Sequence, residues 1–264
     1  MKDRLDKILV SKGLARSREI AGAFIMEGKV VVNGRQITKP GAQVSEDSEI
    51  VLEKADLPYV SRGGLKLEGA LAFFNVNVEG GIIMDVGSST GGFTDCLLQK
   101  GSKKVYCIDV GYGQLAWSIR NDPRVVLLER TNARYLDTIL ASGEIRTAPE
   151  KIADLLNADV DMAVIDVSFI SLTKVVPTVL KFLKGEGEIL ALVKPQFEVG
   201  KGEVGKGGIV KEEEKRLGAV KCVQNFMEGL GLLSSPAYES PVPGQKGNIE
   251  YFLYLRKTEG HLKG

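Results

Sequence analysis

The pattern of apolar and polar positions changes character near residue 57. Before that point, apolar side chains recur at helical spacing in RLDKILVSKGLA and in REIAGAFIMEGK, with glycine stops at Gly13 and Gly28. VVVNGRQI predicts a hairpin that turns at Asn33 and Gly34, and SEIVLEK predicts a further short strand. We therefore expect a small α+β domain over residues 1–56, with a linker that starts near residue 53 in EKADLPYVSRGG.

From about residue 60 onward, near-continuous apolar runs alternate with helical patterns. The runs GIIMDVG, KVYCIDV, RVVLLER, MAVIDVSF and EILALVKP have the composition of parallel strands that are buried on both faces. GLLSSPAYESPV and NIEYFLYLRK predict two more strands that form an antiparallel hairpin. Residues 57–264 are thus expected to form an α/β, Rossmann-like domain with a mostly parallel sheet, in which ligands bind at the carboxyl ends of the strands.

Composition narrows the class of protein. Of the 264 residues, 44% are hydrophobic and 26% are charged, as in an ordinary globular protein. No apolar run approaches the ~18 residues of a membrane span, and MKDRLDKILV lacks the features of a secretory signal, so we expect a cytoplasmic protein. The three cysteines have no metal-type spacing, and we expect no bound metal. The single histidine, His261, lies near the end, which leaves proton transfer to Asp, Glu, Lys or Tyr.

Positive charge is concentrated at the N-terminal end. Residues 1–40 contain nine Lys or Arg and four Asp or Glu, whereas the whole chain has a formal net charge of only +1. This asymmetry favours an anionic partner for the first domain, although charge alone fits a solvated face equally well. LARSREIAGAFIMEGKVVVNGRQITKPGAQV resembles the αL RNA-binding motif of a ribosomal protein, pseudouridine synthases and some tRNA synthetases. The resemblance implies that Arg4, Arg16, Arg18 and Lys39 face RNA.

A glycine-rich turn follows the first buried strand in IIMDVGSSTGGF. It lacks the second glycine of a dinucleotide fingerprint, because position 89 is Ser, and it lacks the lysine of a P-loop. GKGEVGKG matches the P-loop spacing, but it has Gly207 in place of the required hydroxyl. The turn instead fits a zwitterionic adenosyl ligand, with Asp109 at the next strand end placed to accept ribose hydroxyls. A tight turn without a ligand is the alternative.

Four charged residues lie where this fold would bring them together: Lys66 before the first strand, Asp166 and Lys194 at strand ends, and Glu250 at the start of the last strand. Each alone is an ordinary strand-end charge. Together they match the Lys-Asp-Lys-Glu tetrad of FtsJ-like ribose 2′-O-methyltransferases. From about Arg4 to Arg256 the chain is similar to the TlyA family of haemolysin A-like rRNA methyltransferases, in YVSRGGLKLEGAL, DVGSSTGGFTDCLLQKGSKKVYCIDVGYGQL, ERTNAR, DVSFISL and LVKPQFE. Thr90 departs from the proline that is common in FtsJ-type enzymes.

This resemblance implies S-adenosylmethionine as cofactor and a ribose hydroxyl, in a cytidine of rRNA or of assembled ribosomal subunits, as substrate. The implied cofactor contacts are Gly87, Ser88, Gly91, Gly92, Phe93, Asp109 and Asn132. Lys194 is expected to be the base, with a pKa lowered by burial or by the cation Lys66. Asp166 would position Lys194, and Glu250 would hold a lysine.

Two other functions stay open at this point. The chain could be a non-catalytic RNA- or ribosome-binding protein that keeps a methyltransferase fold, or a membrane-damaging haemolysin, as the historical family name suggests. The Gly- and Lys-rich segment 195–210 is either a loop that orders over RNA or a plain solvated loop.

Overall fold

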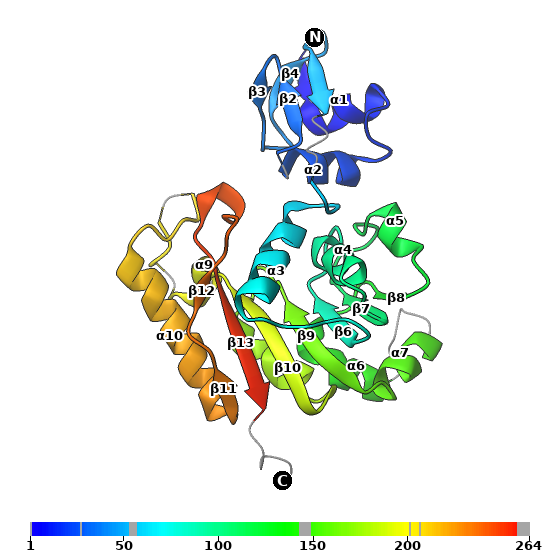
Figure 1. Cartoon of the computed structure of the whole chain (residues 1–264). Coiled ribbons are helices and arrows are strands. Elements are labelled where there is room, and N and C mark those ends of the chain that lie inside the picture. The colour runs from blue at the N-terminus through cyan, green and yellow to red at the C-terminus, as the bar shows by residue number, and fades with distance from the viewer. Residues whose placement is uncertain are drawn as a thin grey trace. The chain divides into compact units, whose positions relative to one another are not determined.

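The computed structural model describes residues 2–26, 28–52, 57–142, 149–200, 202–205 and 207–257. It divides into two compact units, Met1–Arg62 and Gly63–Gly264 (Figure 1). The predicted linker begins in residues 53–56, which lie outside the described ranges, as does His261.

The first unit is the expected α+β domain. Its elements are β1 (Lys2–Arg4), α1 (Leu5–Ser11), α2 (Arg18–Met26), β2 (Val30–Val32), β3 (Arg35–Gln36), β4 (Gln43–Ser45) and β5 (Ile50–Leu52). β1 pairs with β4, and β2 lies between β3 and β5, all antiparallel. Asn33 and Gly34 both have positive φ, 49° and 76°, as the two-residue hairpin turn requires. Apolar residues of both helices and of β2 form the core of this unit, including Leu5, Leu9 and Ile25.

The second unit contains one large mixed sheet. Its strands are β6 (Ile82–Val86), β7 (Lys104–Ile108), β8 (Val125–Leu128), β9 (Val160–Ile165), β10 (Leu183–Val193), β11 (Leu232–Ser234), β12 (Tyr238–Glu239) and β13 (Tyr251–Lys257). The order is β11-β13-β10-β9-β6-β7-β8, with β12 also paired to β13. The five strands β6 to β10 are mutually parallel, whereas β13 runs antiparallel to β10, β11 and β12. The mostly parallel sheet and the antiparallel C-terminal pair are confirmed.

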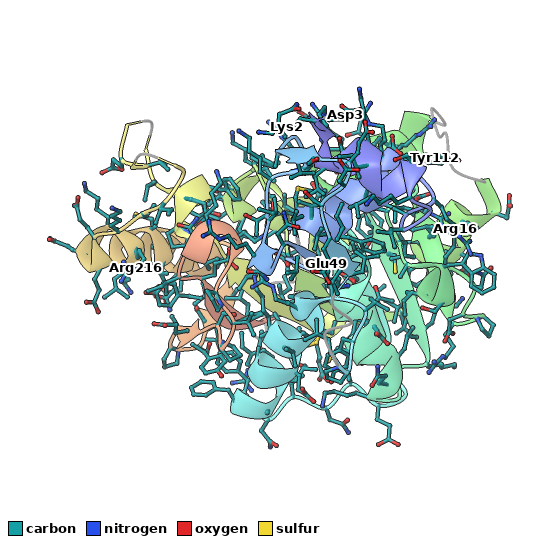
Figure 2. The ribbon with its side chains drawn as sticks, turned by 90° about the horizontal axis from the view of Figure 1, so that it is seen from above. Lys2, Asp3, Arg16, Glu49, Tyr112 and Arg216 are labelled. Carbon is teal, nitrogen blue, oxygen red and sulfur yellow. The ribbon has the colours of Figure 1, made fainter. Side chains whose placement is uncertain are left out.

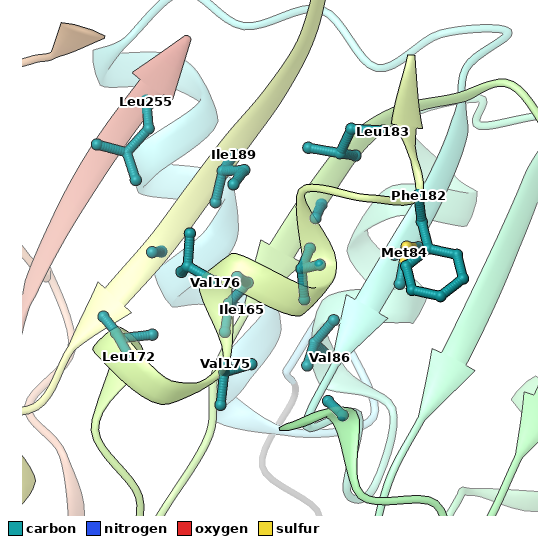
Figure 3. Close-up of a cluster of buried hydrophobic side chains, with 14 of the residues drawn as sticks. Met84, Val86, Ile165, Leu172, Val175, Val176, Phe182, Leu183, Ile189 and Leu255 are labelled. Atoms are coloured by element: carbon teal, nitrogen blue, oxygen red, sulfur yellow. The ribbon is translucent and has the colours of Figure 1, made fainter. Parts of the chain in front are cut away.

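Helices flank this sheet (Figure 1). They are α3 (Arg62–Phe73), α4 (Gly92–Gln99), α5 (Trp117–Arg120), α6 (Leu136–Ser142), α7 (Pro149–Leu156), α8 (Val176–Val179), α9 (Pro195–Glu198) and α10 (Glu213–Gly229), with short 3₁₀ turns η1 (Ala133–Tyr135), η2 (Leu172–Lys174) and η3 (Gln245–Gly247). One core cluster joins β6, β9 and β10 to α8 and α10, and Figure 3 shows Val175 and Val176 packed beside Ile165 and Ile189. This packing fixes the strand ends at which the site is built.

Candidate active site

Sheet topology brings three of the four predicted catalytic residues to one edge, and the fourth, Lys66, lies in α3. Asp166 follows the carboxyl end of β9, and Lys194 follows the carboxyl end of the neighbouring strand β10. Because β13 runs antiparallel to β10, its amino end lies at the same edge, and Tyr251 pairs with Val193. Glu250, one residue before β13, is therefore held next to Lys194 by backbone register.

The four side chains form two ion pairs. Lys194 Nζ lies 2.5 Å from Asp166 Oδ1, and Lys66 Nζ donates to Glu250 Oε2 at 2.6 Å. Lys66 and Glu250 are buried, with 9% and 2% of their surfaces exposed. A carboxylate faces each ammonium group, which is how charged groups are tolerated at such depth.

Each pair also acts electrostatically on the other. Burial alone would raise the pKa of the Asp166 carboxyl, but Lys194 and Lys66 outweigh burial and hold this pKa below its ordinary value. Burial disfavours the charged form of Lys194, yet Asp166 and Glu250 raise its pKa above the ordinary value. The expectation of a lowered Lys194 pKa is therefore wrong for this arrangement, because two carboxylates act on the ammonium group. The two carboxylates thus favour the protonated form of Lys194.

Two glycines make room for the Lys66–Glu250 pair. A Cβ on Gly244 would overlap Glu250 Oε1, so any other residue here would push this carboxylate out of its present position. A Cβ on Gly69, which is in α3, would lie 2.6 Å from Cγ of Pro241. The absence of side chains at both positions lets α3, which carries Lys66, pack against the loop that leads to Glu250.

The glycine-rich turn between β6 and α4 has a left-handed backbone at three positions. Gly87, Ser89 and Gly91 all have positive φ, at 89°, 46° and 94°. A Cβ on Gly87 would lie 2.5 Å from the backbone oxygen of Asp166, so this glycine is required by both conformation and space. The turn therefore lies directly against the strand end that carries Asp166.

Polar groups with unused hydrogen-bonding capacity surround this turn. Asp109 accepts from the N–H of Ser89 at 2.8 Å and of Gly111 at 2.6 Å, which fixes its carboxylate at the end of β7. Within the described ranges, Ser88 Oγ and Asp85 Oδ1 are buried without a hydrogen-bond partner. Burial raises the pKa of Asp85 to about 7, helped by the charges of Asp166 and Asp109. Buried unpaired polar groups are uncommon in proteins, and these fit the ammonium, carboxylate and hydroxyl groups of S-adenosylmethionine.

The other predicted cofactor residues differ in their surroundings. Gly92 is the buried first residue of α4. Asn132 follows β8 at the same sheet edge, and its side-chain oxygen accepts from the N–H of Arg134 at 3.0 Å as the cap of η1. Phe93 is buried and stacks on Phe252, with ring centroids 6.2 Å apart. These contacts fit a core residue, so Phe93 as a cofactor contact stays a prediction.

Sequence reasoning did not single out two residues that contact the ion pairs, or an exposed aromatic ring on the same loop as one of them. Ser168 Oγ accepts from Lys194 Nζ at 3.0 Å, and Gln196 Nε2 donates to Glu250 Oε1 at 3.3 Å. Phe169 is 90% exposed, has a φ of 63°, and contacts the ring of Phe197 with centroids 5.0 Å apart. The signal was present in DVSFISL and LVKPQFE, since these residues lie within three positions of Asp166 or Lys194.

Glu198 anchors the loop that carries Phe169. Its carboxylate accepts from Ser171 Oγ at 2.5 Å and from the N–H of Leu172 at 2.9 Å. Further along the segment 195–210, Gly207 and Gly208 accept from the side chains of Lys246 and Asn248, both at 2.9 Å. Lys201 and Lys206 of this segment lie outside the described ranges.

The predicted RNA-binding residues of the first unit differ in their contacts. Arg16 and Lys39 are exposed, and Arg16 lies on the loop between α1 and α2 (Figure 2). Arg4 and Arg18 both pair with Asp6, at 2.7 and 3.2 Å from its Oδ2. In the residues that the structure describes, no helix is long and apolar enough to cross a membrane. The same residues contain no group of three or more His, Cys, Asp or Glu side chains that could hold a metal ion.

Comparisons with known proteins agree with this division into units. The FtsJ-like methyltransferase family matches residues 59–257, and the S4 domain matches residues 3–50. The 16S/23S rRNA (cytidine-2′-O)-methyltransferase TlyA of Mycobacterium tuberculosis is 47% identical over 96% of this chain and 89% of its own length. Hemolysin A of Brachyspira hyodysenteriae is 39% identical over 96% of this chain and 99% of its own length.

A solved structure from Streptococcus thermophilus, which carries a provisional hemolysin name, superposes with a TM-score of 0.71. It is 42% identical and covers 98% of this chain and 89% of its own. The strand-end tetrad, the glycine turn and these matches lead to one conclusion. The chain belongs to the TlyA family, in which an S4 RNA-binding domain precedes an FtsJ-like methyltransferase domain that uses S-adenosylmethionine.

Proposed function

We propose that this enzyme methylates the ribose 2′-hydroxyl of cytidine in ribosomal RNA. The observation that carries the proposal is the pair of ion pairs, Lys194–Asp166 and Lys66–Glu250, at the sheet edge that also holds the glycine-rich turn. The rRNA cytidine specificity named for the Mycobacterium tuberculosis relative supports the choice of substrate.

The residue types fit the chemistry of a ribose hydroxyl. This hydroxyl is a poor nucleophile, so its proton must leave as the new O–CH₃ bond forms. Lys194 first gives its own proton to solvent water and then accepts the proton of the hydroxyl, and the first of these losses depends on the charges around Asp166. The positive charge of Lys66 also acts on Asp166, and it weakens the attraction between this carboxylate and the Lys194 proton. Lys66, held by Glu250, orients the hydroxyl oxygen. The four groups titrate as a coupled cluster.

The cofactor supplies a methyl group on a positively charged sulfonium when it is bound. Gly87, Gly91 and Gly92 would let the backbone approach it closely, and Ser88 would bind its amino-acid end. Asp109 would accept from its ribose hydroxyls, and Asn132 would lie on the adenine side. The unpaired buried oxygens at this turn support the assignment.

Substrate RNA would be held in two places. In the first unit, Arg4, Arg16, Arg18 and Lys39 would bind the phosphate backbone, and these contacts carry no sequence information. In the second unit, the exposed ring of Phe169 would stack on a base of the target strand, a contact that any base can make. The ribose hydroxyl would then lie near Lys194, because Phe169 follows Ser168, whose Oγ accepts from Lys194 Nζ at 3.0 Å.

The test is methylation of isolated ribosomal subunits with labelled S-adenosylmethionine, followed by nucleoside mass spectrometry. We expect 2′-O-methylcytidine with the wild-type protein and its loss with Lys194→Ala or Asp166→Ala. Lys221→Ala, an exposed lysine of α10, is the matched control and should keep activity. Methylation of a base instead of the ribose would overturn the proposed mechanism.

The same preparations separate the alternative functions. A non-catalytic ribosome-binding protein would bind subunits without binding S-adenosylmethionine in calorimetry. A haemolysin would lyse red cells equally well as wild type and as Lys194→Ala. Cofactor binding and ribose methylation by wild type, with lysis absent, would reject both.

A further inference from the structure

A buried carboxylate in the first unit holds two of the predicted RNA-binding arginines. Asp6, in the first turn of α1, is only 4% exposed. Its Oδ1 accepts from Arg4 Nε at 3.0 Å, and its Oδ2 accepts from Arg4 Nη2 at 2.7 Å and from Arg18 Nη2 at 3.2 Å. One carboxylate thus joins the residue before α1 to the first residue of α2.

The two guanidinium groups lie side by side, because both contact the same oxygen atom. Their side chains are 43% and 52% exposed, whereas the Asp6 side chain is 6% exposed. Asp6 therefore binds one edge of each guanidinium, and among the described residues no other carboxylate pairs with either arginine. The outer N–H groups face solvent with about half of each side chain and can donate to another acceptor. An arginine offers a planar fork of donors that matches the oxygens of a phosphate.

Neighbouring backbone fixes the position of this cluster. The N–H of Asp6 donates to the carbonyl of Pro40 at 3.1 Å, and the N–H of Leu5 donates to the carbonyl of Ala42 at 2.8 Å. The Arg4 guanidinium lies beside Gly41, where a Cβ would come within 3.5 Å of Nη1. The loop that carries Lys39 therefore packs against the same cluster.

The Asp6 side chain is an ionised carboxylate. Its hydrogen bond to Arg4 is the largest cause that holds the pKa of Asp6 well below its usual range, and burial opposes the shift without reversing it. The carboxylate therefore remains ionised at any physiological pH. Without it, two guanidinium groups this close would repel each other and would separate in solvent.

We propose that Asp6 is a positioning residue that holds Arg4 and Arg18 as a preformed site for one phosphate group of an RNA backbone. The inference rests on the proposed RNA docking of the first unit and adds the residue that organises it. Arginines that are already ordered lose less conformational freedom when they bind, so a fixed pair binds a phosphate more tightly than two mobile side chains.

Asp6→Asn distinguishes the preformed site from simple charge attraction, because the two hypotheses predict opposite changes in RNA affinity. The substitution removes a negative charge, so long-range attraction alone predicts tighter RNA binding. The preformed site predicts binding about three- to tenfold weaker, since the arginines lose their anchor. Asp47→Asn removes the same charge at an exposed position of the same unit and should leave binding unchanged or slightly tighter.

The measurement is the Kd of the full chain for deproteinised 16S and 23S rRNA at several salt concentrations. Cofactor affinity and thermal unfolding are followed in parallel to confirm that each variant is folded. In an Arg4→Ala, Arg18→Ala background, Asp6→Asn should cause no further weakening, because Asp6 acts through these two side chains. A purely structural role of Asp6 would weaken binding in both backgrounds.

If Asp6→Asn does not fold, Arg4→Lys and Arg18→Lys replace it. Both variants keep the positive charge but lose the planar set of guanidinium donors, and each should weaken RNA binding several-fold. Unchanged or tighter binding by Asp6→Asn, or unchanged binding by both lysine variants, would refute the preformed site. Failure of the wild-type protein to bind either rRNA would instead refute the proposed docking itself.

Discussion

Replacing Gly87 with alanine tests the close approach between the glycine-rich turn and the strand end that carries Asp166. Gly87 has a φ of 89°, and an added Cβ would lie 2.5 Å from the backbone oxygen of Asp166 and 2.9 Å from its carbonyl carbon. These are backbone atoms, so no rotamer change relieves the overlap. The positive φ costs about 1–2 kcal/mol for an L-residue, and the overlap adds about 1–3 kcal/mol.

Gly80 provides a matched control for this substitution. Its φ is 70°, and a Cβ there would meet no atom within 4 Å, so Gly80→Ala carries the conformational cost without the overlap. In a domain of this size, 1 kcal/mol corresponds to roughly 2–4 °C in Tm. Gly80→Ala should therefore lower Tm by roughly 2–8 °C, and Gly87→Ala by roughly 4–20 °C.

The assay combines thermal unfolding with calorimetric titration of S-adenosylmethionine. Gly87→Ala should also weaken cofactor binding, because relief of the overlap moves either the turn or Asp166. Gly80 precedes β6 at the opposite end of the strand, so its variant should bind the cofactor as wild type does. Equal losses of Tm in the two variants, together with unchanged cofactor affinity, would refute the reasoning.

Three further predictions concern the charges and the exposed ring of the site. Glu250→Gln removes a carboxylate that raises the pKa of Lys194, so the rising limb of the pH–rate profile should move to lower pH; an unmoved limb would argue against Lys194 as the base. Phe169→Ala should slow methylation of subunits by roughly 5- to 160-fold, which corresponds to the about 1–3 kcal/mol of one base stack. Cofactor affinity should be unchanged, and Phe169→Tyr should restore activity. Failure of tyrosine to restore activity would exclude stacking. The pKa of Asp85 is about 7 in the native state against an ordinary 3.8, so between these two pH values the native state keeps a proton that the unfolded chain releases. The free energy of unfolding therefore falls as pH rises from about 4 to about 7. Asp85→Asn should therefore reduce the difference in Tm between pH 5 and pH 8, and an unchanged difference would show that Asp85 is not responsible.

Much of the fold could be read from local patterns. The five continuous apolar runs became β6 to β10, and the strand ends that they define carry Asp109, Asp166 and Lys194. Asn33 and Gly34 marked a hairpin because few residues adopt positive φ without cost. The glycine spacing predicted the turn before α4 for the same reason. These features depend on residues that are close in sequence, and so the sequence alone determines them.

Other features depend on contacts between distant segments, and only the tertiary structure decided them. β13 lies between β10 and β11, which places Glu250 beside Lys66, 184 residues earlier in the chain. The direction of the Lys194 pKa shift also depended on this arrangement. A lysine at a strand end is the same residue in the sequence whether its neighbours in space are cations or carboxylates.

Asp6 shows the same division in the first unit. Its position in the chain is that of an ordinary helix-start carboxylate, and the basic composition around it favoured RNA binding through the arginines alone. Folding brings Arg18 within 3.2 Å of it and excludes solvent from its carboxylate. Local sequence therefore determined which residues carry charge, strands and turns. The packing of distant elements determined which charges face each other, because electrostatic interactions and burial depend on distance in space.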